Sequence, residues 1–202
     1  MSREIIAILR GIRPDEADRI STALIDAGIT RIEVPLNSPE PFDSIARMRA
    51  RAGDAAIVGA GTVLSVADVA RLASIGAQMV VSPDFNPEVI RAAKAAGMLC
   101  YPGVFTPTEC FAALRAGADG IKIFPAGQLG PAGLTAIKAV LPEDARTYAV
   151  GGVGPGDFAA WHKAGVTGFG LGTAIYKPGA GAGDVAERAR AIVAAYDEVF
   201  SK

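Results

Sequence analysis

The sequence predicts an α/β fold, a (β/α)8 TIM barrel built as a single domain over residues 1–202. Short apolar runs alternate with longer amphipathic runs along the whole chain, and this strict alternation favours a parallel sheet. Eight such units in 202 residues favour a compact barrel with short loops. No apolar run is followed by the GxGxxG motif of a doubly wound sheet, which is the alternative fold.

The predicted strands are short segments rich in isoleucine, valine and other apolar residues. Several of them end at a glycine or a proline, residues that interrupt regular structure. In chain order, the expected strands are residues 5–9, 31–36, 55–61, 78–83, 98–103, 120–125, 146–152 and 166–172.

Each predicted helix follows one of these strands and has amphipathic periodicity. Proline stands near the start of many helices, where its missing N–H is tolerated. Four helices end in Ala-Gly, at Gly28, Gly97, Gly117 and Gly165, because glycine most easily adopts the left-handed conformation after a helix. We expect a flexible turn at residues 177–184. The expected helices are residues 14–28, 39–52, 65–76, 87–97, 107–117, 131–140, 155–165 and 184–200.

The composition is that of an ordinary globular protein, with 50% hydrophobic and 20% charged residues. The formal net charge of -1 gives no indication of a nucleic-acid partner or of binding to an anionic membrane. No charge-free stretch is long enough to span a bilayer. The apolar run near the N-terminus is too short for a signal peptide, so we expect a cytoplasmic protein.

Few residues are available for metal or serine-hydrolase chemistry. The single histidine, His162, lies at the end of a predicted helix, where we expect it to face solvent. A histidine-based zinc site or a Ser-His-Asp triad would depend on it. Cys100 and Cys110 form neither a CxxC pair nor a disulfide framework, and we expect two reduced, buried thiols.

Two charged residues, Glu33 and Lys122, stand inside predicted strands, which in a parallel barrel are buried on both faces. Each has an apolar residue on either side in the sequence. Because successive side chains alternate across a strand, the apolar neighbours suit the helix-facing side and the two charges point into the barrel. The alternative is a buried structural ion pair, but such a pair is an inefficient source of stability.

Burial would make Lys122 reactive. A free lysine has a pKa of about 10.4 and is mostly protonated at neutral pH. Desolvation in an apolar barrel disfavours the charged form and yields a nucleophilic amine, which imine formation with a ketone requires. A nearby carboxylate such as Glu33 can move protons between substrate, water and the imine.

Glycine-rich segments follow the last two predicted strands. In this fold the active site lies at the carboxyl ends of the strands, and phosphate is commonly bound after the last two by backbone N–H groups. Gly151, Gly152, Gly172 and Thr173 fit that role. The alternative is that these glycines serve only tight turns.

Two polar residues follow other strands. Thr62 ends the third strand and can offer its hydroxyl to a substrate carboxylate. Arg10 ends the first strand and can pair with the same carboxylate through two hydrogen bonds. Either residue can instead cap a loop.

Together these segments carry a family resemblance. The chain resembles the 2-keto-3-deoxy-6-phosphogluconate / 2-keto-3-deoxy-6-phosphogalactonate aldolases, in family order and over nearly its whole length. Singly, only IKIFP and GAGTVL are distinctive; the combination is highly specific. The matching stretches are IAILRGI (6–12), IEVPLNSP (32–39), VGAGTVL (58–64), IKIFPA (121–126), AVGGV (149–153) and GLGT (170–173).

The resemblance implies a class I aldolase that forms a covalent imine and uses no metal or other cofactor. It implies a small phosphorylated keto-acid substrate and a homotrimer. By the resemblance, Lys122 is the Schiff-base lysine and Glu33 the general acid/base. The glycines after the last two strands, with Thr173, would hold the phosphate, and Thr62 and Arg10 the pyruvate-derived end.

Within the family, the sequence is closest to the galactonate branch. The gluconate enzymes carry an arginine-threonine pair where this chain has Asn37-Ser38, and Pro-Thr where it has Ala149-Val150. Valine cannot hydrogen-bond a substrate hydroxyl, so we expect Val150 to alter selection at C4, the centre that distinguishes the two substrates. Without the loop arginine, Arg10 must take over carboxylate binding.

Several alternatives remain open from the sequence. The gluconate activity, or dual specificity, is the nearest. A phosphosugar isomerase or epimerase would share the phosphate site but would need metal ligands or an acid pair instead of a Schiff-base lysine. A non-catalytic phosphosugar-binding barrel would bind the ligand without trapping pyruvate covalently.

Overall fold

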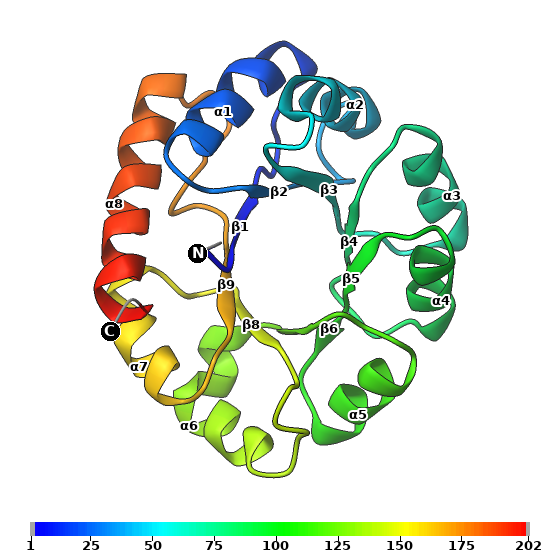
Figure 1. Cartoon of the computed structure of the whole chain (residues 1–202), viewed down its shortest axis with the longest axis vertical. Coiled ribbons are helices and arrows are strands. Elements are labelled where there is room, and N and C mark those ends of the chain that lie inside the picture. Colours follow the sequence, from blue (N-terminus) through cyan, green and yellow to red (C-terminus); the bar gives the residue numbers. More distant parts are fainter. Residues whose placement is uncertain (1–2, 201–202) are drawn as a thin grey trace.

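The computed structural model describes residues 3–200, and residues 1–2 and 201–202 of the predicted unit lie outside this range. The described residues form one nine-stranded sheet in the order β5-β4-β3-β2-β1-β9-β8-β7-β6. All its strand pairs are parallel. Figure 1 shows the strands as a ring with the helices outside it. The predicted (β/α)8 barrel is confirmed.

The strands follow the predicted apolar runs but are shorter at their ends. They are β1 (Ile5–Ile8), β2 (Arg31–Pro35), β3 (Ile57–Gly61), β4 (Met79–Val81), β5 (Leu99–Tyr101), β6 (Gly103–Val104), β7 (Ile121–Ile123), β8 (Thr147–Val150) and β9 (Gly168–Leu171).

The ninth strand arises because the predicted strand 98–103 is divided. Pro102, which has no N–H to donate, separates β5 from β6. β5 pairs with β4, and β6 pairs with β7. The stretch from β5 to β6 therefore closes the ring, because its first half pairs with the strand on one side and its second half with the strand on the other.

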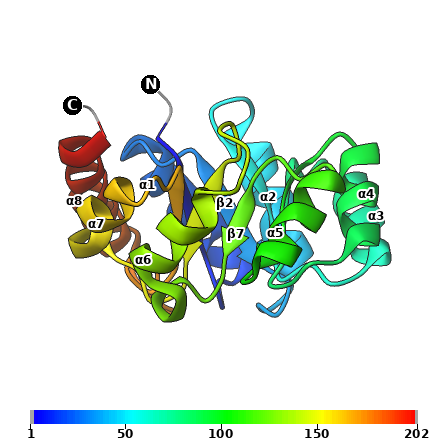
Figure 2. The same cartoon turned by 90° about the horizontal axis from the view of Figure 1, so that it is seen from below.

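The helices cover the outside of the ring in chain order (Figures 1 and 2). They are α1 (Pro14–Asp26), α2 (Pro41–Ala52), α3 (Val66–Ser74), α4 (Pro87–Ala95), α5 (Pro107–Arg115), α6 (Ala126–Lys138), α7 (Phe158–Lys163) and α8 (Ala182–Phe200), with a 3-10 turn at Pro155–Asp157 before α7.

Five helix starts differ from the prediction. α3 begins at Val66, one residue late, and α7 begins at Phe158, because the 3-10 turn takes the three residues before it. α2 begins at Pro41 instead of residue 39, after Glu40 in a left-handed conformation with φ 42°. α6 begins at Ala126, five residues before the predicted start, and is interrupted by a non-helical Gly130. α8 begins within the segment expected to be a flexible turn. The glycine-rich sequences at the starts of α6 and α8 concealed their first helical turns, because glycine is a poor helix former.

The apolar residues form one layer outside the sheet and another inside the barrel. The isoleucines and valine that flank Glu33 and Lys122 belong to the outer layer, as the alternation predicted. Inside the barrel, Ile6, Met79, Val81, Tyr101, Tyr148 and Val150 form a separate cluster. The charged residues of the strands therefore share the barrel interior with this smaller apolar cluster.

Candidate active site

A cavity of about 230 Å³ lies at the carboxyl ends of the strands. The loops after β1, β3, β8 and β9 meet there, together with inward-facing residues of the strands. All nine residues singled out from the sequence line this cavity: Arg10, Glu33, Thr62, Lys122, Val150, Gly151, Gly152, Gly172 and Thr173. Their predicted grouping at one site agrees with the structure, while their chemical roles stay predictions.

Glu33 and Lys122 are both buried, with 2% and 7% of their surfaces exposed. They form no direct ion pair in the described part of the chain. Glu33 Oε2 is buried and has no hydrogen-bond partner among residues 3–200. The Nζ atom of Lys122 lies 4.5 Å from the centre of the Phe124 ring. The two groups are thus buried in one cavity without the contacts that a structural ion pair requires.

Burial shifts the proton affinity of both groups. It raises the pKa of Glu33 to about 7, against the opposing pull of the positive charges on Lys122 and Arg10. It lowers the pKa of Lys122, a shift that Glu33 opposes and Arg10 reinforces. Near neutral pH, Glu33 can therefore both donate and accept a proton, and Lys122 loses its proton more readily than a free lysine.

Gly61 leaves room for the Glu33 carboxylate because it has no side chain. A Cβ at Gly61 would lie 1.8 Å from Glu33 Oε2, so any side chain would displace the carboxylate. The next residue, Thr62, has a φ of 56°, which is uncommon for a residue other than glycine. Such strained backbone is concentrated at functional sites, and here it belongs to a cavity-lining residue.

Arg10 is an exposed residue at the mouth of the cavity. Its Nη1 atom donates a hydrogen bond of 2.5 Å to Oδ1 of Asn37, in the loop after β2. The backbone N–H of Gly11 donates to Oγ of Ser38 at 2.9 Å. The loops after β1 and β2 are therefore tied together beside the site.

The loops after β8 and β9 supply backbone donors. Gly151 has a φ of 88°, and a Cβ built on it would lie 3.2 Å from the Phe124 ring. Within residues 3–200, the N–H groups of Gly152, Val153, Thr173 and Ala174 donate no hydrogen bond to the protein. All four residues line the cavity, so these donors are available to an anionic group of a ligand.

Six further residues that line the cavity were not identified from the sequence: Ile8, Pro83, Phe124, Val153, Gly170 and Ala174. For two of them a signal existed. Ile8 and Phe124 lie two residues from an inward-facing strand residue, so the same alternation predicts that they face the site. Pro83 carries no such signal, because only the fold brings the loop after β4 to this cavity.

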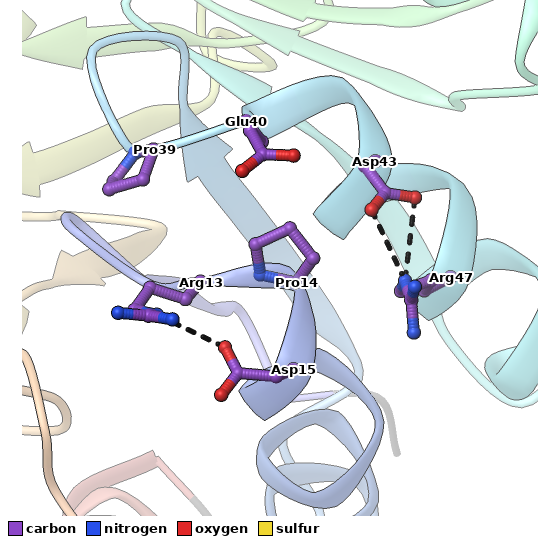
Figure 3. A pocket seen from close by; sticks show the side chains of 7 residues that line it. All are labelled: Arg13, Pro14, Asp15, Pro39, Glu40, Asp43 and Arg47. Carbon is purple, nitrogen blue, oxygen red and sulfur yellow. Dashed lines mark hydrogen bonds and ion pairs between the residues drawn. The ribbon is translucent and has the colours of Figure 1, made fainter.

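A second hollow, of about 540 Å³, lies between the starts of α1 and α2 (Figure 3). Four of its charges pair with one another at the surface: Arg13 Nε lies 3.1 Å from Asp15 Oδ1, and Arg47 Nε lies 3.4 Å from Asp43 Oδ2. It contains no buried titratable group. Its residues are Arg13, Pro14, Asp15, Pro39, Glu40, Asp43 and Arg47. The barrel cavity is therefore the better candidate active site.

The residues that we expect to take no part in the chemistry do not line the cavity. His162 is exposed and packs on Phe200, with 4.4 Å between ring centres. Cys100 and Cys110 are buried free thiols. Among the described residues, no helix is long and apolar enough to cross a membrane. Across residues 3–200, no cluster of three His, Cys, Asp or Glu side chains is arranged to hold a metal ion.

The comparisons with known proteins agree with this geometry. A family model described as "Aldolase: KDPG and KHG aldolase" matches residues 1–188. The chain is 54% identical over 200 residues to a protein of Rhizobium meliloti (strain 1021) named "Probable 2-dehydro-3-deoxy-6-phosphogalactonate aldolase". That match covers 99% of this chain and 94% of the relative.

A protein of Escherichia coli (strain K12) named "2-dehydro-3-deoxy-6-phosphogalactonate aldolase" is 48% identical over 194 residues, which are 96% of this chain and 95% of that protein. Among solved structures, one described as "Native KDPGal structure" superposes with a TM-score of 0.98 at 46% identity. It covers 100% of this chain and 98% of that chain.

Proposed function

Because the chain belongs to the KDPG and KHG aldolase family, we propose that it cleaves 2-dehydro-3-deoxy-6-phosphogalactonate to pyruvate and glyceraldehyde 3-phosphate as a class I aldolase. The single observation that carries the proposal is that Lys122 and Glu33 are both buried in one cavity without forming an ion pair with each other. A structural ion pair does not account for this arrangement, because a buried pair is tolerated only when its two charges compensate each other directly.

Lys122 is the proposed nucleophile. Its lowered pKa increases the fraction of neutral amine that can add to the C2 ketone of the substrate. Loss of water from the adduct gives an iminium ion, which acts as the electron sink for cleavage. In this mechanism the covalent imine replaces any metal or other cofactor.

Glu33 is the proposed proton carrier. With a pKa of about 7, it can donate a proton to the leaving water and afterwards accept one. In its ionised form, directly or through a water, it removes the proton of the C4 hydroxyl, and the C3–C4 bond breaks. Glyceraldehyde 3-phosphate leaves, the enamine is protonated at C3, and hydrolysis of the imine releases pyruvate.

The remaining predicted residues would bind the two ends of the substrate. The free N–H groups of the loops after β8 and β9, at Gly152 and Thr173 among others, support phosphate binding by Gly151, Gly152, Gly172 and Thr173. Arg10 and Thr62 lie in the same cavity and would hold the carboxylate of the pyruvate-derived end.

The galactonate epimer is the proposed substrate for two reasons. The full-length relatives at 54% and 48% identity carry that name. In addition, Val150 lines the cavity and offers no hydrogen bond to a hydroxyl, which removes one means of selecting the gluconate epimer. We further propose that the chain acts in the cytoplasm as a homotrimer.

Trapping with pyruvate and borohydride tests the proposal. Trypsin cleaves after Arg115 and Lys122, but not after a lysine that carries a reduced pyruvate adduct. We therefore expect a mass-shifted peptide that runs through Lys122 to Lys138. No adduct, or an adduct only on other lysines, would overturn the class I mechanism. Cleavage assays with the two C4 epimers then test the substrate, and equal rates would indicate dual specificity.

A further inference from the structure

Asn37 contacts a proposed substrate-binding residue without itself lining the cavity. Its side-chain Oδ1 accepts the hydrogen bond of 2.5 Å from Arg10 Nη1. The neighbouring Ser38 is buried, and its Oγ accepts from the backbone N–H of Gly11. Ser38 N also donates to the carbonyl of Pro35 at the end of β2. The loop that carries Asn37 is thus fixed on both sides.

The chemistry of the contact matters as much as its position. Asn37 offers a neutral oxygen, so it orients the guanidinium without cancelling its charge. Arg13, three residues after Arg10, is instead paired with a negative charge, because its Nε lies 3.1 Å from a carboxylate oxygen of Asp15. The Arg10 charge still acts on the site, where it affects the pKa of both Glu33 and Lys122.

We propose that Asn37 is a positioning residue that holds the Arg10 guanidinium at the mouth of the cavity to receive the carboxylate of a 2-keto acid. This inference rests on the proposed function. An exposed arginine samples many rotamers, and fixing one of them before binding reduces the entropy lost when the substrate binds. Without Asn37, the substrate itself must order Arg10.

The experiment measures the rate of borohydride trapping on Lys122 as a function of pyruvate concentration, and with hydroxyacetone as a neutral ketone. In Asn37→Ala, we expect about a tenfold higher half-saturating pyruvate concentration and an unchanged maximal rate. Trapping of hydroxyacetone stays at the native rate, because it has no carboxylate. In an Arg10→Ala background, adding Asn37→Ala changes nothing further.

Two additional variants separate orientation from folding and from charge. Asn86→Ala is the matched control, because Asn86 Oδ1 caps α4 by accepting from Glu88 N and Val89 N and does not line the cavity. We expect it to lower stability and leave pyruvate saturation unchanged. Asn37→Asp keeps the acceptor but neutralises Arg10, so we expect it to weaken pyruvate saturation as Asn37→Ala does.

The outcomes distinguish this inference from the proposed function. If the native protein traps no pyruvate, the proposed function fails and the inference fails with it. If the native protein traps pyruvate on Lys122, only the inference is at stake. Native-like saturation in Asn37→Ala or Asn37→Asp, an equal loss with hydroxyacetone, or effects that add to those of Arg10→Ala would each overturn it.

Discussion

Charged side chains lie at both ends of the barrel, the lower end at the amino termini of the strands and the upper end at their carboxyl termini, and their contacts differ between the two ends. At the amino-terminal end, the Glu4 carboxylate contacts Arg31 at 3.0 Å and Arg146 at 2.7 Å, and it accepts a hydrogen bond of 2.8 Å from Tyr148. At the carboxyl-terminal end, Glu33 and Lys122 share a cavity with no such contact between them.

The difference separates structural charges from functional ones. At the lower end, attraction and hydrogen bonds compensate the desolvation of each charge, which is how buried ion pairs are tolerated. At the upper end, the neighbouring charges compensate desolvation only in part, and the remainder appears as a raised pKa of Glu33 and a lowered pKa of Lys122. We infer that the groups at the upper end are reactive at the cost of some folding stability, whereas the contacts at the lower end stabilise the closed barrel.

Replacement of Lys122 is expected to give the largest effect. Lys122→Met should lower the rate of cleavage by at least about 10^4-fold, because no other amine replaces the imine-forming nucleophile. Its melting temperature should stay the same or rise, since a buried charge is removed. Steady-state kinetics and thermal unfolding measure both. Lys138→Met is the control, because Lys138 Nζ donates to the carbonyl of Ala145 and does not line the cavity. Substantial cleavage by Lys122→Met would refute the mechanism.

The same substitution at the two ends of the barrel sharpens the comparison. Glu33→Gln should reduce kcat by about 10^3-fold through loss of proton transfer, with no loss of stability. Glu4→Gln should leave kcat within about twofold but lower the free energy of unfolding by about 2 kcal/mol, because Arg31 and Arg146 lose a shared anion that is itself partly exposed. The distinction between the two ends would be wrong if the two variants behaved alike, both losing only kcat or both losing only stability.

The stability of the native chain should also depend on Glu33 in a defined pH window. The folded-state pKa of about 7 lies above the ordinary value of 4.5. The contribution of Glu33 to stability is therefore complete below pH 4.5 and is lost as the pH rises to about 7. Relative to Glu33→Gln, the native free energy of unfolding should fall across this window, by at most about 1.4 kcal/mol per pH unit. A difference that is constant with pH would mean that burial does not shift this group.

The sequence predicted the upper end of the barrel better than the lower end. Strand alternation alone placed Glu33 and Lys122 inside, since two apolar neighbours on a buried strand leave only one direction for the charge. The same alternation puts Arg31 on the Glu33 face, but Arg31 was not singled out. Its partner Glu4 precedes β1, and Glu4 and Tyr148 are 144 residues apart in the chain. Such a pairing follows from barrel closure, which local patterns do not contain.

The same limit explains the other features that the sequence did not predict. The division at Pro102 follows from a strand that must pair with β4 on one side and β7 on the other. The contact between Asn37 and Arg10 joins two loops that are distant in the sequence. Residue type and spacing predict which elements form and which way their side chains face, whereas contacts between loops require the closed barrel.

Gly61 tests how precisely the upper end is built. In Gly61→Ala, the new Cβ would overlap Glu33 Oε2, so the carboxylate must move. We expect a loss of kcat on the order of tenfold to a hundredfold, because small displacements of a catalytic group are costly. The matched control is Gly183→Ala in α8, where an added Cβ meets nothing within 4 Å, and it should keep full activity. Native kcat in Gly61→Ala would show that the position of Glu33 is not critical.

Val150 should give the smallest effect, on the choice between the two C4 epimers. It follows Tyr148 by two residues on β8, so both side chains lie on the same face of the strand. On that face, Tyr148 bonds Glu4 at the lower end and Val150 lines the cavity at the upper end. A Cβ on Gly170 would lie 2.7 Å from Val150 Cγ2, which shows how closely this side chain fills the space over β9. Threonine has nearly the same shape, so Val150→Thr adds a hydroxyl without opening a gap.

We expect Val150→Thr to lower the galactonate-to-gluconate ratio of kcat/KM by about tenfold, the value of one hydrogen bond to a substrate hydroxyl. Measuring both epimers with one enzyme preparation cancels errors in active-site concentration. Val150→Ala is the control, since it removes bulk without adding a donor and should lower both rates with little change in their ratio. If Val150→Ala changed the ratio as much as Val150→Thr, the shape of the cavity, and not hydrogen bonding, would decide which epimer is cleaved.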